Sequence, residues 1–246
     1  MSVGCGPAGA GKVTSAAVIR RVAVLPQPPL LIPELAAGAA DECAELREAC
    51  LQAVQRLTSA SPDWLVVGAA AGAPGVPEHA SGSFRGFGVE LGVSLSRVTV
   101  PETELPLPAL VAGWLRAQAD ASSVRVRLVD PATPPGECAL LGRELGEPAA
   151  VLVLGDGSSR HGPRSPGGED DRAEGFDAGI RDALAKADTG ALAALDPALA
   201  AELGAGGRAP WQILAGLAAE GEWSAEVLYS AAPFGVGYHV AVWEHA

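Results

Sequence analysis

The chain has 246 residues, 48% of them hydrophobic, and a formal net charge of −12 at pH 7. That length and apolar content suffice for one large α/β domain or two small ones. The negative charge argues against partners such as nucleic acid or an anionic membrane surface. No run of 18 apolar residues occurs, so we expect no membrane span.

The first segment, residues 1–17, predicts a disordered leader, because it is rich in small residues and lacks an apolar period. Gly6, Gly11 and Lys12 match the spacing of a phosphate-binding P-loop. The motif also requires a buried strand before it and a hydroxyl directly after the lysine, where this chain has Val13. A nucleotide triphosphatase is therefore almost excluded. The leader also lacks the basic start and apolar core of a secretory signal, so we expect a cytoplasmic protein.

The segment after the leader alternates between strand and helix patterns. Leu46, Cys50, Ala53 and Leu57 follow the spacing of an amphipathic helix within residues 32–60. Two cysteines, Cys43 and Cys50, are too far apart along that helix to form a disulfide. The other elements expected here are a strand at 18–26, a buried strand at 64–67, and a strand or hairpin within 87–100.

The middle of the chain predicts a helix at 107–120, a strand at 124–130, a short helix at 137–146 and a strand at 149–155. The strand at 124–130 alternates valine with Arg125 and Arg127, which indicates one solvent-facing side. The strand at 149–155 is the most apolar of the chain, so we expect it near the centre of the sheet.

The last third begins with a polar loop at 160–173, in which the acidic run 169–171 is expected to be solvated. Three helices follow, at 173–188, 190–203 and 209–221, and the chain ends in a strand pair around Pro233–Gly235. The alternation predicts a three-layer α/β fold with helices on both faces of a largely parallel or mixed sheet. We expect a single domain over residues 18–246.

Ligands of such sheets bind at the carboxyl ends of the strands. The loops there carry few groups able to do chemistry, namely Gln27, Glu34, Asp156, Ser158, Ser159, Arg160 and His161. A serine nucleophile is disfavoured because His161 is too near Ser158 and Ser159 in sequence and no nucleophile elbow is present. Asp156 could hold a metal or a hydroxyl, but an Asp–Gly pair also serves simple turn chemistry.

The four histidines, His79, His161, His239 and His245, show no metal-ligand spacing. We interpret His239, which alternates with Tyr238 on the last strand, as a structural histidine with satisfied hydrogen bonds.

Five stretches together resemble the class III extradiol ring-cleavage dioxygenases, the superfamily that includes the catalytic component of protocatechuate 4,5-dioxygenase. They are VAVLPQPPLLIPELA, PDWLVVGAA, VLVLGDGSSR, LDPALAAELGAGGRAPWQILAGL and APFGVGYHVAVW, and they span about residues 20–243. The chain is most similar to a short, Ala-rich bacterial branch of proteins that resemble this catalytic component. The resemblance implies a three-layer α/β fold and a non-haem Fe(II) held by two histidines and a glutamate, with a further histidine as acid and base.

Compared with the family pattern, this chain lacks the catalytic groups. Gln27 stands at the first ligand position, no histidine follows the second strand near Ala69, and Ser159 stands at the catalytic histidine position. The family's glutamate position lies before Trp211, where residues 207–210 are Gly-Arg-Ala-Pro. Arg160 matches the family, and His161 lies two positions past the catalytic position.

These departures predict a member that has lost its iron site and binds a small molecule or a protein partner without catalysis. We expect no cofactor or metal, and leave a homo-oligomer open. The alternative is an active metal-dependent, ring-cleaving enzyme with an unorthodox ligand set, which would require Fe(II).

Deletion of residues 1–17 should leave the thermal midpoint of unfolding unchanged, because the segment contributes no core. MgATP should not raise that midpoint, whereas a ligand of the native state would raise it. A rise in MgATP that disappears in Lys12→Ala would show that the P-loop spacing is functional.

Overall fold

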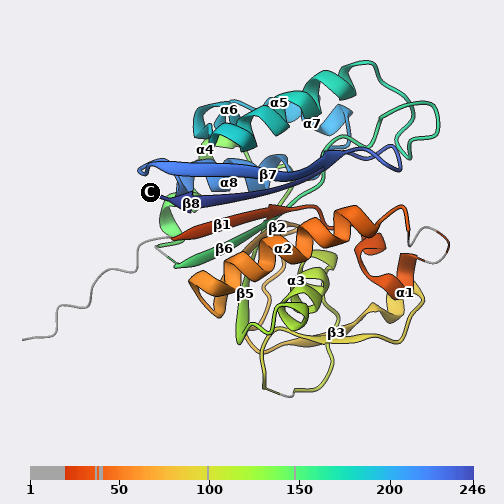
Figure 1. Cartoon of the computed structure of the whole chain (residues 1–246), viewed down its shortest axis with the longest axis vertical. Helices are drawn as coiled ribbons and strands as arrows, with labels where there is room; N and C mark the ends of the chain where they lie inside the picture. The colour runs from red at the N-terminus through yellow and green to blue at the C-terminus, as the bar shows by residue number, and fades with distance from the viewer. Residues whose placement is uncertain (1–19, 37, 39–40, 99, 147) are drawn as a thin grey trace, which may run out of the picture.

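The computed structural model describes residues 20–246, apart from 37, 39–40, 99 and 147 (Figure 1). The predicted leader and its P-loop-like motif therefore lie outside the described residues. Cys43, Cys50 and Cys138 are buried free thiols, which confirms that Cys43 and Cys50 do not pair. In the part of the chain described here, no helix is both long and apolar enough to cross a bilayer.

A six-stranded mixed sheet forms the centre of the fold, in the order β5-β2-β6-β1-β8-β7 (Figure 1). β1, β2, β5 and β6 are parallel, whereas β8 runs antiparallel to β1 and β7 antiparallel to β8. The strand bounds are β1 Arg21–Leu25, β2 Asp63–Ala69, β5 Ser123–Val129, β6 Ala150–Leu154, β7 Trp223–Ala231 and β8 Tyr238–His245. A separate pair comprises β3 Ser81–Ser83 and β4 Gly92–Ser94.

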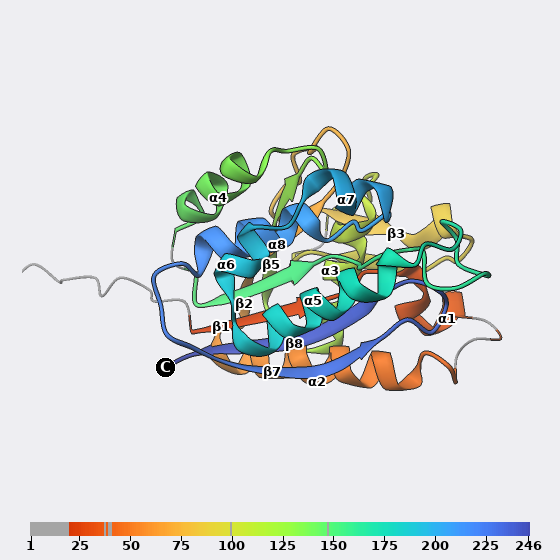
Figure 2. The same ribbon diagram turned by 90° about the horizontal axis from the view of Figure 1, so that it is seen from above.

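Helices cover both faces of this sheet, as the sequence predicts (Figure 2). α2 (Ala44–Ala60) and α3 (Leu107–Gln118) cover one face. On the other lie α4 (Pro135–Glu144), α5 (Arg172–Lys186), α6 (Thr189–Ala193) and α8 (Arg208–Leu217). The short elements α1 (Pro33–Ala36), α7 (Pro197–Glu202) and two 3-10 turns, Pro29–Leu31 and Phe84–Phe87, complete the fold.

The alternation of side chains across β1 and β6 supplies the two main core layers. Ala23 and Leu25 pack with Leu152 against α2, while Val22 and Val24 pack on the α5 and α8 side. Every residue of β6 is buried, because strands on both sides and helices on both faces surround it. The prediction of a central strand at 149–155 is confirmed.

The amphipathic helix expected within 32–60 is α2, in which Leu46, Cys50, Ala53 and Leu57 are all buried, and the short α1 precedes it. Two other sequence expectations were wrong in detail. The helix expected at 190–203 is divided into α6 and α7, because Pro197 starts a new helix capped by Asp196, whose carboxylate accepts a hydrogen bond from the Ala198 N–H. The hairpin expected within 87–100 is formed instead by β3 and β4, with the 3-10 turn at 84–87 between them.

Leu152→Ala should lower the free energy of unfolding by about 2–5 kcal/mol, because the side chain is fully buried in a close-packed layer. Urea denaturation monitored by tryptophan fluorescence measures this loss. Leu140→Ala is the matched control, since Leu140 on α4 is 52% exposed and its truncation should change stability little. Equal losses in the two variants would contradict the central position of β6.

Candidate functional site

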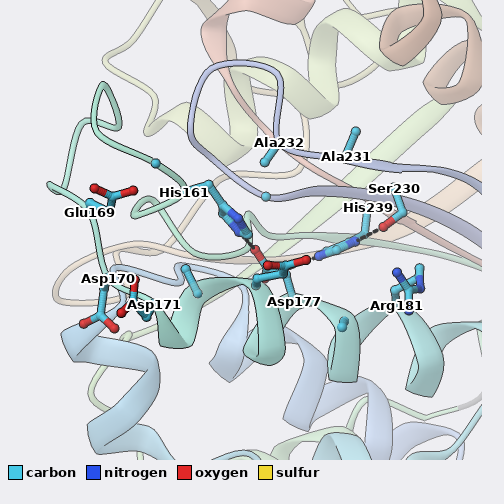
Figure 3. Close-up of a pocket in the computed structure, with 15 residues that line it drawn as sticks. His161, Glu169, Asp170, Asp171, Asp177, Arg181, Ser230, Ala231, Ala232 and His239 are labelled. Carbon is cyan, nitrogen blue, oxygen red and sulfur yellow. Dashed lines mark hydrogen bonds and ion pairs between the residues drawn. The ribbon is translucent and has the colours of Figure 1, made fainter.

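A cavity of about 510 Å³ opens at the carboxyl end of β6, between the loop after that strand, the start of α5 and the β7–β8 hairpin (Figure 3). Its volume lies within the range of small-molecule sites. The cavity lies at the edge of the sheet that the strand-end rule selects. Of the three loops that the rule selects, the one carrying His161 lines this cavity.

The floor of the cavity centres on Asp177 of α5, a residue only 5% exposed. The Ser158 N–H lies 3.1 and 3.2 Å from its two oxygens. Two glycines make room for the carboxylate, since a Cβ on Gly157 or Gly237 would lie 2.4 or 2.0 Å from its oxygens. Both glycines are thus required by the space that Asp177 occupies.

Two histidines approach this carboxylate from different segments. His161 Nε2 lies 2.5 Å from Asp177 Oδ2, a short hydrogen bond. His239 Nε2 lies 3.5 Å from Asp177 Oδ1, within ion-pair range but without hydrogen-bond geometry, and this buried nitrogen has no hydrogen-bond partner. The other ring nitrogen of His239, Nδ1, lies 2.9 Å from Ser230 Oγ. The expectation that His239 is fully satisfied is therefore wrong.

Backbone pairing holds the β6 loop against the hairpin. The Gly157 N–H donates to the Gly237 carbonyl at 2.7 Å, and the Gly237 N–H donates to the Ser158 carbonyl at 2.8 Å. The His161 N–H donates to the Gly235 carbonyl at 3.1 Å. The position of the His161 ring thus depends on the hairpin, which is more than 70 residues away in sequence.

The mouth of the cavity is acidic. Five of its lining residues carry carboxylates and one, Arg181, is an arginine; the carboxylates are Glu169, Asp170, Asp171, Glu174 and Asp177. Hydrogen bonds from Arg172 lower the pKa of Asp170 to about 2, so this group stays ionised. Asp170 is paired with Arg172, but Glu169, Asp171 and Glu174 make no ion pair with any described residue, so the field at the mouth favours a cationic ligand.

The positions singled out by the family resemblance lie in different surroundings. The Gln27 N–H donates to Asp156 Oδ1 at 2.8 Å, and Gln27 Oε1 is buried without a hydrogen-bond partner. Ala69 packs against a separate apolar cluster that includes Val67 and Val129. Neither Gln27 nor Ala69 lines the cavity at Asp177.

Ser159, at the family's catalytic position, is directed toward the 203–207 segment. Its N–H donates to the Leu203 carbonyl at 2.9 Å, and a Cβ on Gly204 would lie 2.3 Å from its Oγ. The neighbouring Arg160 packs its aliphatic stem near Gly167. Of the predicted site residues, His161 therefore lines the cavity, whereas Ser159 and Arg160 do not.

The resemblance leaves the exact position of the family's glutamate open, and the segment before Trp211 holds Arg208. The Arg208 side chain is 4% exposed and donates to the Thr133 carbonyl at 2.6 Å and to Gln212 Oε1 at 2.9 Å. These contacts join α8 to the loop before α4. Arg208 therefore has a structural role and offers no metal ligand.

Together, Gln27, Ala69, Ser159 and Arg208 do not fit an iron centre of two histidines and a carboxylate. Within the described ranges, no group of three or more His, Cys, Asp or Glu side chains has a geometry that could hold a metal. At Asp177 the donor types are suitable, but the 2.5 Å contact with His161 is too short. Two ligands of one metal at about 2.1 Å stand about 3.0–3.4 Å apart.

Asp156 is the second unusual carboxylate near this edge. Its side chain keeps partial solvent access, yet burial raises the pKa to about 6, against the opposing effect of the Gln27 N–H. Burial is the main cause of the raised pKa values of Cys50 and Tyr238. The negative charge of Asp156 raises both pKa values further. Asp156 therefore lies in an apolar setting shared with these side chains.

No protein-family model and no curated protein matches this chain.

Asp177, His239 and Ser230 are the site residues that sequence reasoning missed. Asp177 shares a buried helix stripe with Ala173, Ile180 and Leu184, at spacings of three and four residues. A carboxylate in such a stripe needs buried partners, so this pattern was a usable signal. Ser230 and His239 carry no comparable signal, because their pairing depends on the strand register.

Asp156 should make the folded state less stable as pH rises. Its pKa in the folded chain, about 6, exceeds the ordinary value of 3.8. The stability that Asp156 contributes to the folded state is therefore fully present below about pH 4 and is lost as pH rises through 6. The loss should be at most about 3 kcal/mol, because partial solvent access screens the charge.

Denaturation curves of wild type and Asp156→Asn between pH 4 and 7.5 measure this effect. The variant should gain stability relative to wild type as pH rises, and Asp63→Asn on the exposed start of β2 is the control. A constant difference between wild type and Asp156→Asn across this range would contradict the assignment.

Proposed function

We propose that this chain is a ring-cleavage-dioxygenase-like α/β protein that binds a small organic cation, without the iron chemistry of that family. The observation that carries the proposal is the cavity above Asp177, in which a buried carboxylate faces two histidines beneath an acidic mouth. The ligand class follows from the charge of that mouth.

The arrangement suits an ammonium or guanidinium group. Such a group donates hydrogen bonds and brings a positive charge, while the cavity offers carboxylate oxygens and imidazole nitrogens as acceptors. The exposed Glu174 adds attraction at the entrance, whereas the charge of Asp170 is offset by its ion pair with Arg172. The long-range field of a chain with net charge −12 acts in the same direction.

A metal-dependent enzyme is the second candidate, and one observation favours it. His161, His239 and Asp177 are the residue types of a two-histidine, one-carboxylate centre, although His161 would have to withdraw from the carboxylate to admit a metal. Elemental analysis separates the two candidates. We expect no stoichiometric iron or zinc and no oxygen uptake with Fe(II) and a catechol; about one iron per chain together with ring cleavage would favour the second.

Thermal unfolding in the presence of spermidine, agmatine or choline tests the cation proposal. A cation at ten times its Kd should raise the midpoint by about 3–6 °C, whereas succinate and glycerol should not. Added salt should weaken the effect, because the attraction at the mouth is electrostatic.

Two charge-neutralising variants locate the effect. Glu174→Gln, at the mouth, should reduce the midpoint shift, and Glu48→Gln, on the exposed side of α2 across the sheet, should not. Equal responses to cations and anions, or equal effects of the two variants, would count against this binding site.

A further inference from the structure

Ser230 lines the same cavity and is the only hydroxyl among its lining residues. Its Oγ lies 2.9 Å from His239 Nδ1, and His239 Nε2 faces Asp177 Oδ1 at 3.5 Å (Figure 3). Hydroxyl, imidazole and carboxylate therefore lie in order in Ser230, His239 and Asp177, with a hydrogen bond between the first two groups and an ion-pair-range contact between the last two. This is the order of groups that activates a serine nucleophile.

A β-bulge creates this arrangement. Val227 pairs with Ala241, but after a register shift Tyr229 pairs with Val240 and Ser230 with His239. Without the extra residue, Tyr229 would stand opposite His239, and Ser230 would point to the other face of the sheet. Bulges redirect side chains in this way beside active sites.

Electrostatics selects one tautomer of His239. If Nδ1 carried the proton, the lone pair of Nε2 would face the negative carboxylate of Asp177 with no proton between them. With the proton on Nε2, the N–H lies on the side of the carboxylate, 3.5 Å from Oδ1 and without hydrogen-bond geometry, and Nδ1 is free to accept the Ser230 hydroxyl proton. Asp177 then stabilises the imidazolium that forms when His239 takes that proton.

Other contacts hold this carboxylate in place. The Ser158 N–H and His161 Nε2 both bind Asp177, and His161 occupies the oxygen that does not face His239. The carboxylate is thus fixed in an orientation that leaves Oδ1 directed at His239. His161 acts here as a positioning residue.

We propose that Ser230 is a nucleophile that accepts an acyl group from a small carboxylic ester. Ser230 Oγ forms a bond to the acyl carbon while its proton passes to His239 Nδ1. The bond from the acyl carbon to the leaving alkoxide breaks, and the alkoxide takes the proton from His239. Water then attacks the acyl-serine, with His239 again taking and returning one proton, so that the acid is released and Ser230 is restored.

The surroundings of Ser230 suit such a substrate. Ala231 and Ala232 follow it on the cavity wall, and their short side chains leave space for an acyl group. β7 is an edge strand of the described sheet, so one side of its backbone has no strand partner there. We assign to N–H groups on this side the role of donors to the developing oxyanion. The acidic mouth favours esters that carry a cationic group.

A neutral fluorophosphonate probe, followed by peptide mass spectrometry, tests the proposal directly. Ser230 of the wild-type chain should be labelled, and His239→Gln should lower the labelling rate by about 10²-fold or more. Ser224→Ala is the matched control on the same strand, because Ser224 is exposed and donates to the Glu244 carbonyl; it should label at Ser230 like wild type. Because the probe is uncharged, the result does not depend on cation binding.

Thermal unfolding shows whether His239→Gln is folded. A second variant, in which His239 is kept, tests the proposal even where His239→Gln fails to fold. Ser230→Cys in the otherwise intact chain should react with iodoacetamide about ten-fold or more faster than Ser224→Cys, because His239 withdraws the thiol proton. An unlabelled Ser230, labelling that persists in folded His239→Gln, or equal alkylation of the two cysteine variants would each overturn the proposal.

Discussion

The buried carboxylate of Asp177 joins three parts of the chain that are distant in sequence. It binds the Ser158 N–H and His161 of the β6 loop and faces His239 of β8, while its own backbone belongs to α5. Burying an isolated carboxylate costs several kcal/mol, so these partners must be present together. The contacts that stabilise the charge therefore also fix the geometry of the cavity.

The topology of the sheet makes this meeting possible. β8 runs antiparallel to β1, so the start of β8 lies at the edge where β1 and β6 end. The hairpin turn then pairs with the β6 loop through Gly157 and Gly237. Larger side chains at these two glycines would collide with Asp177, so the close approach of two backbones and one carboxylate determines both residues.

The resembled family and the observed cavity use the same edge of the sheet in different ways. The positions that the resemblance assigns to iron ligands hold Gln27 and Ala69, which lie beside the partly exposed Asp156 and an apolar cluster respectively. Two of the four histidines, His161 and His239, lie at Asp177 instead, and His161 is two residues beyond the position that the resemblance assigns to the catalytic histidine. The cavity there brings together a serine, two histidines and a carboxylate beneath an acidic mouth.

The sequence alone determined the layers and the central strand. The apolar run at 149–155 requires burial on both faces, and alternating strands and helices require a covered sheet, because these patterns reflect local periodicity and solvent exclusion. The buried stripe of α5 also held the information that Asp177 needs partners. Which partners it has was decided only by tertiary structure. The one-residue bulge in β7 and the pairing of the hairpin with the β6 loop depend on contacts between distant segments, and a shift of one residue would move Ser230 to the opposite face.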